Sequence, residues 1–272
     1  MKGKDILNNI TEKLLGKRTS NSVVGSSYKQ FNDGNVMRSP VILAVLFVVT
    51  ISDLIPTYDL SKESIEFVSF RSKPAPPSVD AVSRCETIPW NGCQAQFNEI
   101  LGLNNLLYWR NGTIINKQVN QLLQANTTEL VKVCNARTQF YQCLGTSYYA
   151  CLNLFNILDT SDPDFVNAFD YTRTFLGLEF MCNAGFEEVV TQWPCLHGIQ
   201  STIAYQNCMN NFTYNVYPTN FCNMVDTTGK CLNNVYLNAC GDNGAGWFGC
   251  ENFRFTFDQT CWGLRCNVGV VY

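Results

Sequence analysis

The sequence has no cysteine among its first 84 residues, a single histidine and few charged side chains. Charged residues make up 15% of the chain, against roughly 25% in an average globular protein. From Cys85 onward, fourteen acidic residues stand against eight basic ones. Binding to nucleic acid requires a basic surface that displaces counterions from phosphates. The sequence therefore argues against a nucleic-acid partner.

The apolar run that precedes the cysteines is short and covers residues 41–51. A helix that spans a bilayer needs about 20 apolar residues, whereas a secretory leader needs only about 7 to 15. Residues 40–56 therefore predict a signal peptide or a short uncleaved signal anchor, with a buried core helix as the third alternative. Basic residues precede the run and acidic ones follow it, which places the N-terminal side in the cytoplasm. The remainder is expected outside, in a secreted protein or a single-pass type II membrane protein.

Met37 lies just before this run and leaves the start of translation open. A chain beginning at Met37 would carry a compact secretory leader, with possible cleavage ahead of Asp53. Residues 1–39 would then be a mispredicted start. In the chain as written, they form a polar, basic tail of cytoplasmic type.

The segment that follows is expected to be a stalk. Residues 57–84 sustain neither a helical nor a strand period and contain three prolines, Pro74, Pro76 and Pro77. Such composition favours an extended, flexible linker. The cysteine-rich domain is then expected to cover residues 85–272, and the membrane to be contacted only through residues 40–56, if these stay uncleaved.

Fourteen cysteines occupy that domain, and their even number beyond a translocation signal predicts disulfides in an oxidising compartment. A structural zinc site would need closely spaced ligand pairs, yet no C-x-x-C pair is present and His197 is the one histidine. No metal or cofactor is therefore expected. The pairing stays open. The cysteines are Cys85, Cys93, Cys134, Cys143, Cys151, Cys182, Cys195, Cys208, Cys222, Cys231, Cys240, Cys250, Cys261 and Cys266.

The spacing of some cysteines indicates how they are used. Cys134 and Cys143 lie nine residues apart, as do Cys231 and Cys240. At 100° per residue, nine residues bring the second thiol to the opposite face of a helix. Each pair should therefore join its helix to two different neighbours, which predicts a compact helical bundle.

Helix-capping signals favour an all-α fold over the alternative of a β-sandwich. Asn126 with Glu129 forms an N-cap pattern for a helix that runs to residue 144. Asp162 and Pro163 predict the start of another, interrupted by Gly185. Glycine follows Cys240 as a C-terminal cap of a third helix over 228–239. Weaker patterns cover 146–158 and 199–209, and a short strand near 252–257 is the exception.

Possible catalytic groups have simpler structural interpretations. His197 lacks the neighbours of a known hydrolytic pair, and Pro163 interrupts the acidic series that begins at Asp159 as a calcium loop might. Asp170, Glu179 and Glu187-Glu188 are no more than helix carboxylates by their spacing. The sequence therefore predicts no enzyme.

Three N-glycosylation acceptors lie beyond the apolar run, at Asn111, Asn126 and Asn211. Asparagine is so abundant there that about three are expected by chance. Aromatic residues cluster at 165–180 and 247–262, where they either fill a core or line an apolar cavity.

The cysteine pattern also resembles a known family. It is carried by Tyr141-Gln-Cys143, by Cys182 with the four residues before it, by Trp193-Pro-Cys195-Leu196, by Ala239-Cys240-Gly241, and by Cys261 with Cys266. This rhythm is similar to that of a nematode-expanded family of cysteine-rich extracellular domains of unknown function. The resemblance implies secretion or surface display and supplies no catalytic residues.

The function expected from the sequence is therefore that of an extracellular, disulfide-stapled interaction module for an unknown protein or small ligand. Covalent staples hold a surface rigid, so that binding costs little ordering entropy. A carrier of a small apolar ligand such as a lipid is the alternative, and a hydrolase is the third.

Overall fold

Helices dominate this computed structural model, which describes residues 53–70, 85–159 and 164–269. No strand occurs in these ranges, so the predicted all-α, disulfide-rich fold is confirmed. The strand considered near 252–257 is wrong, because most of that segment belongs to the last helix, whose N-cap Asp242 accepts a hydrogen bond from the backbone of Ala245. No helix of the described ranges is long and apolar enough to cross a membrane.

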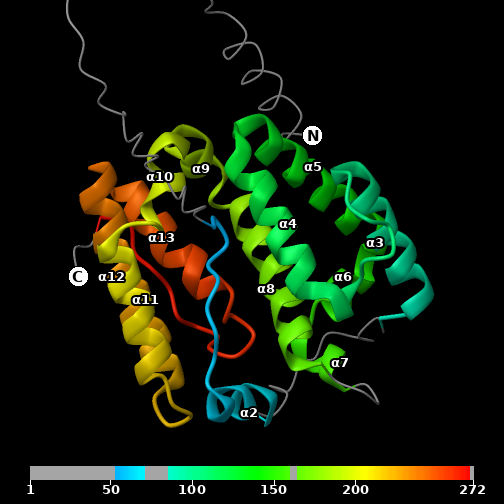
Figure 1. Ribbon diagram of the computed structural model, residues 1–272, viewed down its shortest axis with the longest axis horizontal. Coiled ribbons are helices and arrows are strands. Elements are labelled where there is room, and N and C mark those ends of the chain that lie inside the picture. Colours follow the sequence, from blue (N-terminus) through cyan, green and yellow to red (C-terminus); the bar gives the residue numbers. More distant parts are fainter. Residues whose placement is uncertain (1–52, 71–84, 160–163, 270–272) are drawn as a thin grey trace, which may run out of the picture. The chain divides into compact units, whose positions relative to one another are not determined.

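From α8 (Phe165–Met181) onward the helices follow one another through short turns (Figure 1). In chain order they are α2 Lys62–Phe70, α3 Thr87–Leu101, η1 Trp109–Asn111, α4 Gly112–Ala125, α5 Thr127–Leu144, η2 Gly145–Ser147, α6 Tyr148–Cys151, α7 Leu154–Leu158, α8 Phe165–Met181, α9 Phe186–Thr191, α10 Trp193–Ile199, α11 Ile203–Asn215, α12 Phe221–Cys240 and α13 Asn243–Phe255.

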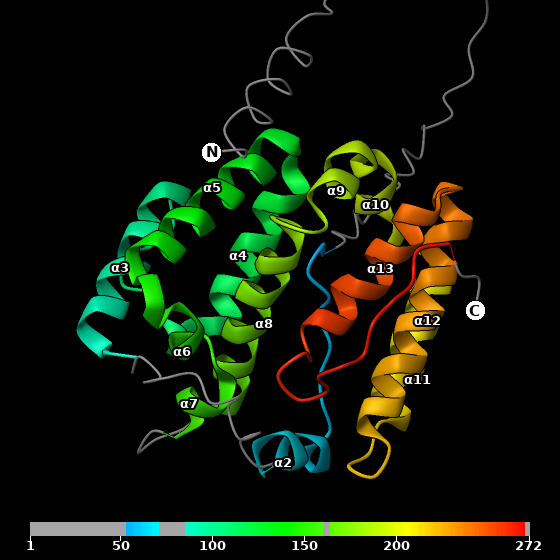
Figure 2. The ribbon, with the colours of Figure 1, turned by 180° about the vertical axis from the view of Figure 1, so that it is seen from behind.

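Seven disulfides pair all fourteen cysteines, as predicted, and they divide the helices into two halves. Cys85–Cys151, Cys93–Cys143 and Cys134–Cys182 close the first half, α3 to α8. The second half, α9 to α13, is closed by Cys195–Cys240, Cys208–Cys231, Cys222–Cys261 and Cys250–Cys266. No disulfide joins the two halves. They meet through packing of α8 on α13 and α9 (Figures 1 and 2).

The prediction drawn from the nine-residue spacings is confirmed. On α5, Cys134 binds Cys182 at the end of α8, while Cys143 binds Cys93 of α3. Helix α12 is joined to α11 and to α10 in the same manner. Each of these two helices therefore connects two neighbours covalently.

Helix boundaries agree in part with the sequence. Asn126 caps α5 as expected, and Gly241 ends α12 with a φ of 67°. The start expected for α8 is wrong: Asp164, rather than Asp162, caps this helix and accepts a hydrogen bond from the backbone of Asn167. The weak patterns at 146–158 and 199–209 correspond to α6 with α7 and to α11, whose start is residue 203.

Residues 53–60, which we call the strap, form an extended segment between the two halves (Figure 1, blue). From α4, the side-chain oxygen of Asn120 accepts from the backbone N–H of Ile55 at 2.8 Å, and its amide donates to the Ile55 carbonyl at 3.2 Å. From α13, Asn252 donates to the Leu54 carbonyl at 2.6 Å. The strap is therefore bound by both halves at once.

The strap corrects the predicted stalk and domain boundary. Residues 57–70 are folded rather than extended into solvent, because the ring of Tyr58 packs against Phe169, Phe212 and Phe253 and because α2 buries Val68. Leu54 and Ile55, assigned above to a leader or anchor, are fully buried in the core. The folded domain thus includes residue 53 onward. Residues 71–84 and 1–52, with Met37 and the apolar run, lie outside the described residues.

Candidate functional site

A cleft of about 530 Å³ opens between the strap, α4 and the N-terminal part of α8. This volume falls within the range of about 300 to 1,000 Å³ that is usual for small-molecule sites. One side is apolar and includes Leu60, Val166 and Phe169, whereas α4 contributes polar groups such as Asn116 and Lys117. The cleft is therefore amphipathic.

A buried ion pair lies at the base of this cleft. Asp170 and Arg173 are one helical turn apart on α8, and their charged atoms approach to 2.9 Å. The hydroxyl of Thr113 on α4 donates to the other carboxylate oxygen at 2.6 Å. Arg173 in turn donates to the carbonyl of Tyr58 in the strap at 3.1 Å. The pair therefore connects all three walls of the cleft.

The guanidinium of Arg173 also lies near two aromatic rings, at 5.1 Å from the centroid of Tyr58 and 5.5 Å from that of Phe169. Burial raises the pKa of the Tyr58 hydroxyl well above its ordinary value, although Arg173 opposes the shift. Tyr58 thus stays neutral and shares a hydrogen bond of 2.9 Å with the hydroxyl of Thr256. A neutral phenol and a paired arginine favour binding and positioning over proton transfer.

A second, partly buried carboxylate is likewise paired with an arginine. Glu179 forms an ion pair with Arg137, and Tyr148 donates to Glu179 at 3.3 Å. Asp170 and Glu179 therefore each have their own arginine partner. Glu187 and Glu188 lie in the first turn of α9, where negative charge stabilises a helix.

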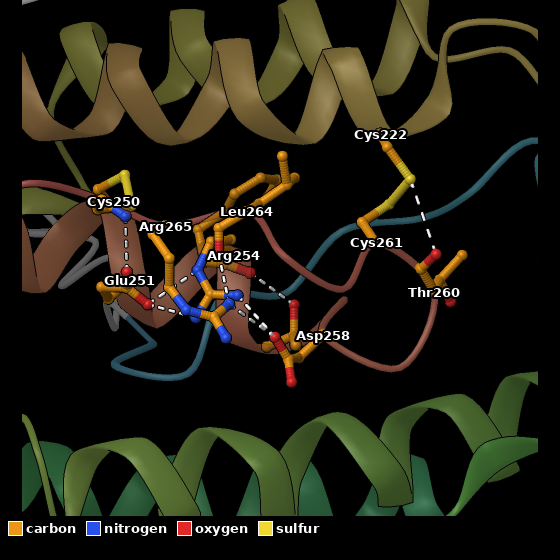
Figure 3. A network of polar contacts seen from close by, with 12 residues as sticks. Cys222, Cys250, Glu251, Arg254, Asp258, Thr260, Cys261, Leu264 and Arg265 are labelled. Carbon is orange, nitrogen blue, oxygen red and sulfur yellow. Dashed lines mark hydrogen bonds and ion pairs between the residues drawn. A yellow bond between two sulfur atoms is a disulfide. The ribbon is translucent and has the colours of Figure 1, made fainter. Parts of the chain in front are cut away.

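A third network fixes the C-terminal segment against α13 (Figure 3). Glu251 accepts from Arg254 at 2.8 Å and from the backbone N–H of Cys266 at 2.7 Å. Arg254 also contacts Asp258 at 2.8 Å. The disulfides of Cys250 and Cys222 flank this network. The network has a structural role, because its carboxylates and guanidinium groups neutralise one another.

His197 has a packing role in α10. Its ring stacks on that of Trp193 with centroids 4.3 Å apart, and Nδ1 lies 3.0 Å from the Trp193 carbonyl oxygen. Asp164 serves as the cap of α8, while Asp162 lies outside the described residues. Within those residues, no group of three His, Cys, Asp or Glu side chains is placed to hold a metal ion.

The three glycosylation acceptors lie in different settings. Asn111 is half-buried where η1 meets α4 and accepts from the backbone of Tyr108. Asn126 is exposed, and its Oδ1 caps α5 by accepting from Glu129 at 3.0 Å. Asn211 is exposed on α11. A glycan bonds to Nδ2, so capping through Oδ1 leaves the atom that Asn126 would use free.

The sequence did not indicate the strap. The local signals for the cleft were the aromatic cluster at 165–180, of which Phe169 lines the cleft, and the i,i+3 spacing of Asp170 and Arg173. Comparisons with protein-family models, curated proteins and solved structures find no match. The chemistry of the described residues is therefore the basis for function. Its seven disulfides mark the protein as extracellular or secreted.

Proposed function

We propose that this protein is an extracellular binding protein without catalytic activity, which holds a small amphipathic molecule in the cleft between the strap, α4 and α8. The observation that carries the proposal is a cleft of ligand size that combines an apolar wall with the buried Asp170–Arg173 ion pair. Small-molecule sites have this composition, with mostly apolar walls and a few placed polar groups.

The scaffold suits such a role because its staples limit motion around the cleft. Helices α4 and α8 pack on each other, and α5, which packs on both, is tied to the end of α8 by Cys134–Cys182. A preorganised site loses little conformational entropy on binding. The strap supplies the third wall through Tyr58 and Leu60 without any covalent tie to the halves among the described residues.

We further propose that the apolar run is a cleaved leader, with the type II anchor as the alternative. Because Leu54 and Ile55 belong to the core, the uncharged run available to a membrane ends near residue 51. Eleven helical residues span about 17 Å, against a hydrocarbon thickness of about 30 Å. N-terminal sequencing of the secreted product tests this, and a product that retains residues 41–51 contradicts it.

Native mass spectrometry of protein secreted from eukaryotic cells tests the ligand proposal. We expect an additional bound mass on the wild type. Val166→Trp should abolish it, because Val166 lines the cleft and is 56% exposed, so a larger ring can fill the space. Ile88→Trp is the matched control, since Ile88 is 86% exposed on α3 and lies outside the cleft.

A bare mass for the wild type, or equal ligand retention in both variants, would contradict the proposed site. Display of a surface to a protein partner is the second candidate function, and a bare mass would favour it. It is supported by the exposed rings of Tyr141 and Tyr149, which both pack against the buried ring of Tyr148, since Tyr is frequent in interface hot spots. The resemblance to nematode extracellular domains belongs to this proposal.

A further inference from the structure

A groove of about 620 Å³ lies between α11 and α12, far in sequence from the cleft described above. None of the residues that line it carries a charge, and four are asparagines. Asn207 and Asn211 come from α11, while Asn234 and Asn238 come from α12. The spacing of four residues within each pair places both members on one face of their helix.

These amides make the groove suitable for a neutral, hydroxyl-rich ligand. Each asparagine offers two N–H donors and a carbonyl acceptor, which match sugar hydroxyls and acetamido groups. Ala204 and Val235 add small apolar contacts of the kind that pack against the C–H face of a sugar ring. The absence of charged lining favours a neutral carbohydrate over an ionic ligand.

The same groove contains a glycosylation acceptor. Asn211 precedes Phe212 and Thr213, and it is exposed while Phe212 is fully buried. Its Oδ1 accepts a hydrogen bond from Asn215 at 2.8 Å, and this bond does not use Nδ2, the atom to which a glycan is attached. Side chains on a helix lean toward the N-terminus. A sugar on Asn211 would therefore extend toward Asn207 and Ala204, along the groove.

We propose that Asn211 carries an N-linked glycan and that the α11–α12 groove binds its first sugar residues. This rests on the extracellular location. In the transfer, the amide nitrogen of Asn211 loses a proton and bonds to the anomeric carbon of a lipid-pyrophosphate-linked oligosaccharide, whose lipid pyrophosphate leaves with the electron pair of the broken bond. Asn207 and Asn238 then hydrogen-bond the attached sugar.

Asn126 provides an internal reference on the same chain. It is an exposed acceptor at the start of α5 and does not line this groove. Glycans at Asn126 and Asn211 are attached in the same cells and purified together. A difference in their release rates therefore reflects the protein surface around each glycan.

The experiment follows enzymatic release of glycans by peptide N-glycosidase from the undenatured, secreted protein, with site-resolved mass spectrometry of the resulting Asn-to-Asp conversion. We expect release at Asn211 to be roughly 30- to 150-fold slower than at Asn126, as two or three net hydrogen bonds of average strength imply. After denaturation the two rates should be equal. Asn238→Trp, which fills the groove at an exposed position, should bring Asn211 to the rate of Asn126.

Asn207→Ala with Asn238→Ala is a milder variant that should also accelerate release at Asn211, in case the tryptophan impairs folding. Thr213→Ser retains the acceptor and should leave the rate unchanged, whereas Thr213→Ala should abolish the glycan. An unmodified Asn211 beside a modified Asn126, or equal native release rates, would overturn the proposal. Neither result affects the cleft, because Val166→Trp reports on that site separately.

Discussion

The packing of the strap against α8 can be measured by substituting Ile55 of the strap and Gly177 of α8, singly and together. Ile55 is fully buried, and a Cβ added at Gly177 would lie 3.2 Å from both Cγ1 and Cγ2 of Ile55. Such a contact is tighter than most Cβ contacts in proteins, so the Ile55 side chain must shift by a few tenths of an ångström. We therefore expect Gly177→Ala to lower the free energy of unfolding by about 1 to 2 kcal/mol, as overpacking outweighs the higher helix propensity of alanine.

Ile55→Ala removes the clashing atoms and leaves a cavity, with an expected loss of about 2 to 5 kcal/mol. In that background Gly177→Ala should cost nothing, or stabilise by up to about 1 kcal/mol, because only helix propensity remains. The double-mutant cycle should thus give a coupling energy of about 1 to 3 kcal/mol. Guanidinium unfolding under non-reducing conditions measures all four proteins.

Gly92→Ala on α3 is the matched control. A Cβ at Gly92 would meet nothing within 4 Å, so this variant should be neutral or slightly stabilising in both backgrounds. Equal cost of Gly177→Ala with and without the Ile55 side chain would refute the reasoning, because the strap would then not lie against α8.

Three further outcomes follow from the same contacts. Arg173→Met should lower the free energy of unfolding by about 3 to 5 kcal/mol, since it leaves Asp170 as a buried charge without its partner; a loss below about 1 kcal/mol in chemical denaturation would speak against a buried pair. Burial raises the pKa of Tyr148 from 10.0 to about 12. The neutral Tyr148 phenol therefore contributes fully to stability below pH 10, and this contribution is lost as the pH rises toward 12. Ultraviolet titration of the phenol should show the raised pKa, and Tyr148→Phe should flatten the dependence of stability on pH between these values. Asn126→Ala removes both the N-cap of α5 and a glycosylation acceptor, and it should lower the free energy of unfolding by about 1 kcal/mol. Thr128→Ala removes the glycosylation acceptor alone. Equal thermal shifts of the two variants in unglycosylated protein would therefore exclude a stabilising effect of the cap.

Local sequence patterns were sufficient to predict the helices and to predict that cysteines on opposite faces of one helix bind two different neighbours. Helix caps and nine-residue spacings depend only on neighbouring residues, so Asn126, Gly241 and the two-sided use of α5 and α12 followed directly. The capping residue of α8 was misplaced by two positions because Asp162 and Asp164 offer the same side chain and only tertiary packing selects between them.

The strap could not be predicted because its partners are distant in the chain. Asn120 lies 65 residues from Ile55, and Asn252 lies 198 residues from Leu54. An extended segment that packs on two different walls shows no single period, so residues 57–60 have the sequence character of a linker. The cleft was missed for the same reason, since one of its walls is the strap.

The absence of any cystine between residues 85–182 and 195–266 has a consequence for a nicked molecule. One peptide-bond cleavage between Cys182 and Cys195 would yield two fragments, each internally cross-linked, which boiling in detergent without reductant should separate. In native buffer they would remain a non-covalent pair, held by α8 against α13 and by the strap. A secreted protease could thus turn a single polypeptide into a heterodimer without breaking one sulfur–sulfur bond.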